Sequence, residues 1–210
     1  MLTCAGMTQE RTQIEVVFFD VGGVLCADVI DEKLTDLSKN YGLPPGKLLD
    51  LKPALRLQAD LGEIDEDQFW SRILAEAGLR ARPDDLLFEN YLVAVPGSLE
   101  LAVRLGRRLR LAILSNDSAT MSRARRDMFG FDDIFDPIVI SSHVGLVKPD
   151  ARIYSLAAKR AGVACDSCLF IDNTCENVDA ARASGMPALH FQDAARLEDD
   201  LSRLGLLEDD

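Results

Sequence analysis

Several polar side chains stand where apolar, strand-like runs of this chain end. Asp20 follows the run VVFF and precedes Gly22 and Gly23, where the missing side chains let the backbone approach a ligand closely. Ser115 and Asn116 follow the run LAIL. The carboxyl ends of parallel strands share one sheet edge, and open α/β sheets bind their ligands there. We therefore expect these groups to line one crevice.

Two further motifs add a cation and oxygen ligands to this edge. Lys148 follows VGLV, while Asp172 and Asn173 follow CLFI. This set suits phosphoryl chemistry, in which the Asp20 carboxylate attacks phosphorus while Mg²⁺ and Lys148 offset the charge. The Ser115 hydroxyl and the backbone N–H groups near the glycines would hold phosphate oxygens. A divalent metal is expected because an anionic nucleophile must approach an anionic substrate.

The segments that must position these residues alternate between strand-like and helix-like patterns. We expect strands over residues 14–19, 109–114, 137–140, 168–171 and 187–190. Amphipathic helices are expected over residues 98–107, 119–128, 151–161 and 177–184. Gly162 and Gly185 follow the last two helices, where a residue that tolerates positive φ is common. The alternation predicts an α/β fold with a largely parallel sheet.

One spacing interrupts this alternation. Asp20 and Ser115 are 95 positions apart, whereas a βαβ unit takes about 30 residues. Residues 28–95 have helical periodicity, and Asp65 with Gln68 predicts a helix start with a capping box. The pattern divides the chain into a core of residues 13–27 and 96–210, a helical insert of residues 28–95, and a flexible N-terminal segment of residues 1–12.

The end of the insert is also expected to be helical. Pro83 suits a first helical turn, and Leu86, Leu87 and Tyr91 follow at helical spacing. The whole insert therefore predicts a small helical bundle over the mouth of the sheet.

Composition restricts the partners. The chain has 23 Lys and Arg against 35 Asp and Glu, a net charge of −12 that would repel nucleic acid and anionic membranes. The apolar runs are too short to span a bilayer and the first residues lack a signal pattern, so we expect a cytoplasmic protein.

Cys165 and Cys168 lack the second pair that a zinc site needs. The arginines are expected on a solvated face, namely Arg104, Arg107, Arg108, Arg110, Arg123, Arg125 and Arg126.

Four stretches carry a family resemblance. They are FFDVGGVL at residues 18–25, ILSND at 113–117, VGLVKPDARIY at 144–154 and FIDNTCENVDAARASGM at 170–186. In this order, with a helical insert that contains GEIDEDQFW, they resemble the haloacid dehalogenase superfamily of hydrolases. The resemblance implies a Rossmann-like three-layer core with a small helical cap. It also implies an aspartyl-enzyme intermediate on Asp20, phosphate ligands at Ser115 and Lys148, and Mg²⁺.

Two positions depart from the family pattern. The phosphatases usually carry a second Asp two residues after the nucleophile, where it protonates the leaving oxygen and later activates water, but this chain has Gly22. The backbone carbonyl at that position, a metal ligand in the family, is retained. Asn173 replaces an Asp that ligates the metal in many relatives. We expect Mg²⁺ to bind weakly to Asp20, Gly22, Asp172 and Asn173, although Asp172 could instead orient Lys148.

These departures leave three functions open. The first is a phosphatase of a small phosphorylated metabolite, and FDVGGVL resembles a branch of family phosphatases with Gly at this position. The second is a metal-independent dehalogenase, whose halide product needs no proton, although those enzymes carry Ser at position 172 and Asp at position 177. The third is a vestigial phosphate-binding protein. Selectivity would come from the insert, where Lys52, Arg56 and Gln58 are candidates.

Overall fold

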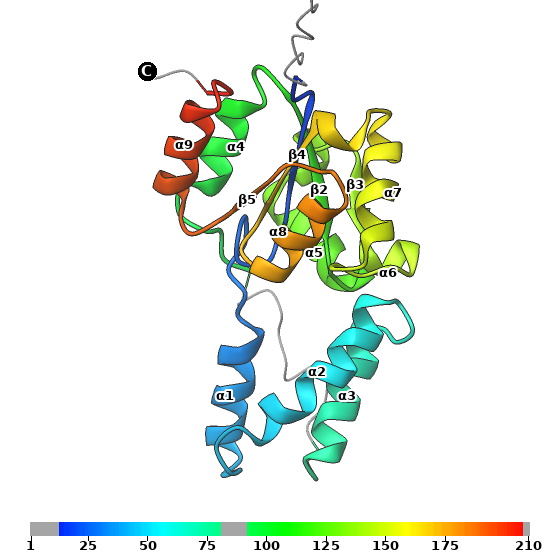
Figure 1. Ribbon diagram of the computed structural model, residues 1–210. Coiled ribbons are helices and arrows are strands. Elements are labelled where there is room, and N and C mark those ends of the chain that lie inside the picture. The colour runs from blue at the N-terminus through cyan, green and yellow to red at the C-terminus, as the bar shows by residue number, and fades with distance from the viewer. Residues whose placement is uncertain (1–12, 81–91, 208–210) are drawn as a thin grey trace, which may run out of the picture.

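A single parallel sheet forms the centre of the protein. The computed structural model describes residues 13–80 and 92–207. Its strands are β1 (Val16–Phe19), β2 (Arg110–Ser115), β3 (Ile138–Ile140), β4 (Cys168–Asp172) and β5 (Ala188–His190). They pair in parallel in the order β3-β2-β1-β4-β5 (Figure 1). The five predicted strands are confirmed, with every end within two residues of the prediction.

The helices of the core follow the strands in the predicted alternation. They are α4 (Ser98–Leu105), α5 (Ala119–Phe129), α6 (Ser141–Val144), α7 (Ala151–Ala161), α8 (Cys175–Ala183) and α9 (Ala194–Arg203), with 3-10 turns η3 (Phe131–Asp133) and η4 (Cys165–Ser167). Gly162, predicted to end α7, has a φ of 73° and caps that helix. The sequence did not predict α9, whose buried side chains are only Leu197 and Leu201.

The side chains of β1 alternate between two apolar layers. Val17 and Phe19 pack in one cluster with residues of α4 and α9. Val16 and Phe18 face the opposite cluster, which contains residues of α7 and α8. The strand is therefore covered on both faces, as its wholly apolar sequence requires. The result is the expected three-layer α/β core, and it holds the ends of β1, β2 and β4 in fixed register.

The insert contributes three described helices with an apolar core of their own. They are α1 (Ile30–Asn40), α2 (Lys47–Asp60) and α3 (Glu66–Glu76). Leu34, Leu48, Leu55, Phe69 and Trp70 are among the buried side chains of this cluster. The three helices lie beyond the carboxyl-terminal edge of the sheet (Figure 1). We call them the cap helices.

One of the cap helices, α3, begins as its local sequence predicts. The predicted capping box of α3 is present: the Asp65 carboxylate accepts a bond from the Gln68 backbone N–H, and the Gln68 side chain accepts one from the Asp65 N–H. The expectations for Pro83, Leu86, Leu87 and Tyr91, and for residues 1–12, lie outside the described residues. Within the described part of the chain, no helix is long and apolar enough to cross a membrane.

Candidate active site

A cavity of about 210 Å³ lies between the sheet edge and the cap helices. It is lined by Asp20, Gly22, Asp28, Ile30, Lys52, Arg56, Asp60, Asn116, Asp117, Arg125, Lys148, Asn173, Thr174 and Asn177. Of the residues predicted from the strand ends, Asp20, Gly22, Asn116, Lys148 and Asn173 are thus brought together. Three others do not line the cavity, namely Gly23, Ser115 and Asp172.

Lys148 is the centre of a buried charge cluster. Its Nζ lies 2.8 Å from Asp20 Oδ1 and 2.6 Å from Asp172 Oδ2. Asp172 is fully buried, and its oxygens also accept bonds from the Asn177 side chain at 3.0 Å and the Thr174 N–H at 2.7 Å. With both oxygens occupied, Asp172 orients the Lys148 ammonium toward Asp20. This geometry matches one of the two roles that the sequence left open for Asp172.

Burial shifts the proton affinities of this cluster. It raises the pKa of Asp20 from 3.8 to about 6, and the nearby Asp172 charge adds to the increase while Lys148 opposes it. Burial alone would lower the pKa of Lys148, but the two carboxylates outweigh burial and raise it. The Lys148 ammonium thus forms ion pairs with two carboxylates, and these keep Lys148 charged.

Two residues at the end of β2 have different roles. The Asn116 amide accepts a bond from the Lys148 N–H at 2.8 Å and donates one to the Lys148 carbonyl at 2.9 Å. Asn116 therefore fixes the backbone of Lys148, and its side chain is already committed to that contact. Ser115 is 1% exposed, and its hydroxyl has no hydrogen-bond partner in the described chain. A ligand oxygen at the sheet edge would satisfy this hydroxyl.

The residues predicted to bind a metal offer oxygen atoms, but few of these oxygens are negatively charged. Asp20 supplies the one carboxylate that faces the cavity from the predicted set, beside Gly22 and Asn173. A Cβ added at Gly23 would lie 2.2 Å from Asn173 Nδ2, so the amide packs directly against the glycine turn. No group of three or more His, Cys, Asp or Glu in residues 13–80 and 92–207 could hold a metal. Oxygen donors of this kind fit Mg²⁺, which retains several waters, but as a site of low charge.

A second buried ion pair closes one side of the cavity. Arg125 Nη1 lies 2.7 Å from Asp117 Oδ2, and both side chains are almost fully buried. Burial raises the pKa of Asp117, although Arg125 opposes this shift. The expectation of a solvated arginine face is therefore wrong for Arg125, because the fold turns that side of α5 toward Asp117. The cap of α5 is Ser118, whose hydroxyl accepts a bond from the Met121 N–H.

The cap helices contribute charged side chains of both signs. Arg56 Nε lies 2.9 Å from Asp60 Oδ1, and Arg56 Nη1 lies 3.1 Å from Glu66 Oε2. Lys52, which also lines the cavity, pairs with Asp31. Two of the three predicted selectivity residues thus face the cavity. The third, Gln58, instead accepts a bond from Arg72 and does not line it.

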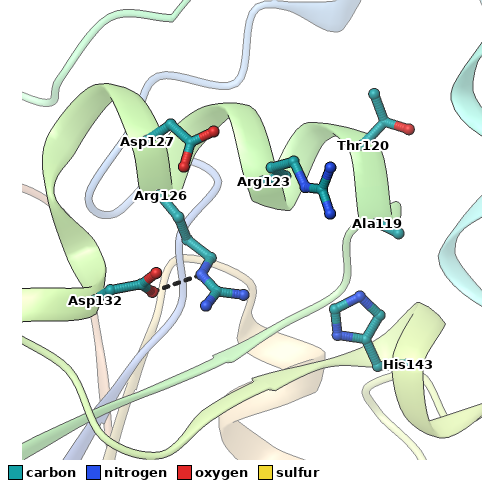
Figure 2. Close-up of a pocket in the computed structure, with 7 residues that line it drawn as sticks. All are labelled: Ala119, Thr120, Arg123, Arg126, Asp127, Asp132 and His143. Carbon is teal, nitrogen blue, oxygen red and sulfur yellow. Dashed lines mark hydrogen bonds and ion pairs between the residues drawn. The ribbon is translucent and has the colours of Figure 1, made fainter.

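A larger pocket of about 380 Å³ lies beside α5, and it contains none of these groups. Figure 2 shows its lining, which is Ala119, Thr120, Arg123, Arg126, Asp127, Asp132 and His143. Arg126 Nε is paired there with Asp132 Oδ1 at 2.6 Å. That pair is exposed to solvent rather than buried, and the pocket contains none of the groups predicted from the strand ends, so the smaller cavity is the candidate active site.

The chain resembles known hydrolases in sequence and in fold. It is 34% identical over 145 residues to a phosphatase of Mycobacterium tuberculosis, covering 64% of this chain and 65% of that protein. It is 35% identical over 114 residues to an (S)-2-haloacid dehalogenase of Pseudomonas, covering 52% of this chain and 48% of that one. These matches span about half to two thirds of the two relatives.

A solved structure and a family match extend this likeness over most of the chain. A HAD family enzyme from Bacteroides thetaiotaomicron, crystallised with magnesium and inorganic phosphate, superposes with a TM-score of 0.70 at 21% identity, over 86% of this chain and 95% of that one. Residues 14–185 match the family described as haloacid dehalogenase-like hydrolase. The chain therefore belongs to the haloacid dehalogenase-like hydrolases.

Proposed function

We propose that this hydrolase is a Mg²⁺-dependent phosphatase of small phosphorylated metabolites, with Asp20 as its nucleophile. The observation that carries the proposal is the Asp20 carboxylate facing a cavity while ion-paired at 2.8 Å to the buried Lys148. Lys52, Arg56 and Arg125 add positive charge to the same cavity. Together with Lys148 they balance the four carboxylates that line the cavity, so the cavity does not share the excess negative charge of the chain, which is −12 overall.

The residues have distinct roles in the proposed reaction. An oxygen of Asp20 attacks phosphorus and displaces the alcohol, and water then hydrolyses the resulting aspartyl phosphate. Lys148 neutralises the charge that develops on the phosphoryl group. The unpaired Ser115 hydroxyl is the proposed donor to one of the phosphoryl oxygens, and because it does not line the cavity, its side chain must shift to reach one. Asp172 and Asn116 act through Lys148, the first by orienting its ammonium and the second by fixing its backbone.

The expected metal has candidate ligands. Asp20, the backbone carbonyl of Gly22 and the amide oxygen of Asn173 would hold Mg²⁺, with water completing its shell. When bound, the ion would reduce the repulsion between the Asp20 carboxylate and the substrate phosphate. The neutral amide favours weaker binding than a second carboxylate would give. The Bacteroides relative was crystallised with magnesium and inorganic phosphate, which supports the choice of Mg²⁺ as the metal.

The small cavity supports a small substrate. Its volume of about 210 Å³ is below the roughly 300 to 1,000 Å³ of pockets for drug-sized ligands. The phosphoryl group itself would occupy the space beside Asp20 and Lys148. This leaves room for a compact alcohol portion next to the cap side chains.

Carbon-centred dehalogenation is the second candidate. Gly22 supplies no acidic side chain, and a halide leaving group needs none. The similarity to the Pseudomonas dehalogenase supports this alternative. In that reaction Asp20 would attack carbon and displace halide, and no metal would be required.

Product release distinguishes the candidates. Phosphate release should be measured from sugar phosphates, nucleotides and a nitrophenyl ester, with and without Mg²⁺, and halide release from 2-haloacids. We expect metal-dependent phosphate release that Asp20→Asn abolishes. Halide release without phosphate release would establish the second candidate. Phosphate binding without turnover of any ester or haloacid would instead indicate a vestigial protein.

A further inference from the structure

A phosphatase with Gly22 needs another proton donor for the leaving alcohol. Four carboxylates line the cavity, and one of them is the nucleophile. We propose that Asp60, at the end of cap helix α2, is the general acid that protonates the leaving oxygen and the general base that activates water. This inference rests on the proposed phosphatase function and assigns a catalytic role to the cap.

Two contacts with the core hold Asp60 in place. Two residues after it, Gly62 lies so close to Ser142 that an added Cβ would be 2.5 Å from the Ser142 carbonyl oxygen. Farther along, Glu66 Oε2 accepts a bond from the Ser118 hydroxyl at 2.5 Å. The turn that follows Asp60 is therefore fixed against the core at Gly62 and at the first residue of α3. A cap residue fixed in this way can act on a substrate bound at the sheet edge.

The surroundings of Asp60 suit proton transfer near neutral pH. Burial raises its pKa from 3.8 to about 6, and the charges of Asp117 and Glu66 add to this effect while Arg56 opposes it. Arg56 Nε bonds to Oδ1, and Oδ2 has no partner in the described chain. One carboxyl oxygen is therefore anchored and the other is available to a substrate. A pKa near the working pH is what a general acid and base requires.

The other two carboxylates of the cavity are less suitable. Asp117 is held by Arg125 at 2.7 Å in an almost fully buried pair. Asp28 is exposed in the segment before α1, where its Oδ1 accepts a bond from the Ile30 N–H. Asp60 and Asp117 each accept an arginine bond at one oxygen, but the Asp60 side chain is 15% exposed against 5% for Asp117, so Asp60 is the more accessible to a substrate.

The proposed steps balance in atoms and protons. As Asp20 forms its bond to phosphorus, the bond from phosphorus to the alcohol oxygen breaks, and that oxygen takes the electron pair and the proton of Asp60. Water then enters, gives a proton to the Asp60 carboxylate and attacks phosphorus. The bond between phosphorus and Asp20 breaks, which releases inorganic phosphate and regenerates both residues.

Leaving-group dependence tests this role. Asp60→Asn retains an acceptor for Arg56 but cannot donate an acidic proton. The first turnover of an alkyl phosphate should fall about 10²- to 10⁴-fold, because an alkoxide leaves poorly. The first turnover of a nitrophenyl phosphate, followed as a burst of nitrophenolate, should fall less than about tenfold, because nitrophenolate needs no proton. Asp50→Asn, on the exposed side of α2, is the matched control and should leave both rates unchanged.

A second variant supplies the missing acid from the core. A Cβ at Gly22 would meet no atom within 4 Å and its φ is outside the left-handed region, so Gly22→Asp fits. Combined with Asp60→Asn, it should restore alkyl phosphate turnover at least tenfold. If Asp60→Asn lowered the first-turnover rates of the alkyl and the nitrophenyl phosphate equally, or lowered neither, Asp60 would not be the general acid. Failure of the wild type on every ester would instead contradict the phosphatase function itself.

Discussion

The ammonium of Lys148 lies 2.8 Å from a carboxylate oxygen of Asp20. The same ammonium also serves Asp172 at 2.6 Å, so two buried carboxylates share one cation. The cluster therefore carries an excess negative charge when both carboxylates are ionised. This explains why Lys148 only partly offsets the rise that burial causes in the pKa of Asp20. An ionised Asp20 in this cluster therefore stabilises the fold less than a carboxylate with a cation of its own would.

Asp20→Asn should consequently change how stability depends on pH. The folded pKa of Asp20, about 6, exceeds its ordinary 3.8, so the protonated group stabilises the fold at low pH and this contribution is lost as pH rises through 6. Relative to wild type, the free energy of unfolding of the variant should rise by about 2 to 3 kcal/mol between pH 4 and 8. Urea unfolding with a chelator present measures this. A difference independent of pH would contradict the raised pKa.

Asn173→Asp should strengthen Mg²⁺ binding. The change replaces a neutral amide oxygen with a carboxylate beside Asp20, and ligand charge is a main determinant of affinity for hard cations. We expect the dissociation constant to fall by roughly tenfold or more in isothermal titration calorimetry. Asp20→Asn, which removes the carboxylate from the proposed ligand set, should weaken binding in the same experiment. Unchanged affinity in Asn173→Asp would show that position 173 does not face the metal.

Gly23→Ala should destabilise the protein, whereas Gly22→Ala should not. Gly23 has a φ of 76°, and an added Cβ would lie 2.2 Å from Asn173 Nδ2. The left-handed backbone alone costs a side chain about 1 to 2 kcal/mol, and the collision with Asn173 adds to this. Gly22 has open space and a compatible φ, so its substitution should change stability by less than about 1 kcal/mol. Chemical unfolding of both variants gives the comparison, and equal losses would contradict the close contact with Asn173.

The core half of the site follows directly from the sequence. Asp20, Asn116 and Asn173 come after apolar runs that become neighbouring parallel strands, and parallel strands place their carboxyl ends at one edge. Lys148 reaches the same edge from the loop between α6 and α7. The apolar runs mark where each strand ends, and the parallel pairing of the strands brings those ends together.

The cap half of the site could not be predicted in this way. Gln58 and Asp60 are two positions apart on α2 and hence point about 200° apart, yet only the orientation of the helix against the core decides which one faces the cavity. The structure selects Asp60, while Gln58 accepts a bond from Arg72. That orientation comes from contacts distant in sequence, such as Gly62 against Ser142 and Glu66 with Ser118. No local periodicity encodes them.

Glu66→Gln should weaken the cap helices and their attachment to the core. Glu66 is 1% exposed and accepts bonds from Arg56, from the indole of Trp70 at 3.1 Å and from Ser118 of the core. The neutral amide loses the charge assistance of these bonds and has one acceptor oxygen in place of two, which leaves a buried donor unsatisfied. We expect the free energy of unfolding to fall by about 1 to 3 kcal/mol.

Trp70 makes this loss observable within the cap itself. It is the single tryptophan of the chain, so its fluorescence during urea unfolding reports on α3. Glu63→Gln, three residues earlier and exposed, makes the same substitution without these contacts and should stay within about 0.5 kcal/mol of wild type. Equal unfolding curves for the two variants would show that Glu66 does not fasten the cap. Glu66 also pairs with Arg56, and Arg56 pairs with Asp60. Because Glu66→Gln weakens the first of these ion pairs, we expect it to raise KM for a phosphate ester more than Glu63→Gln does.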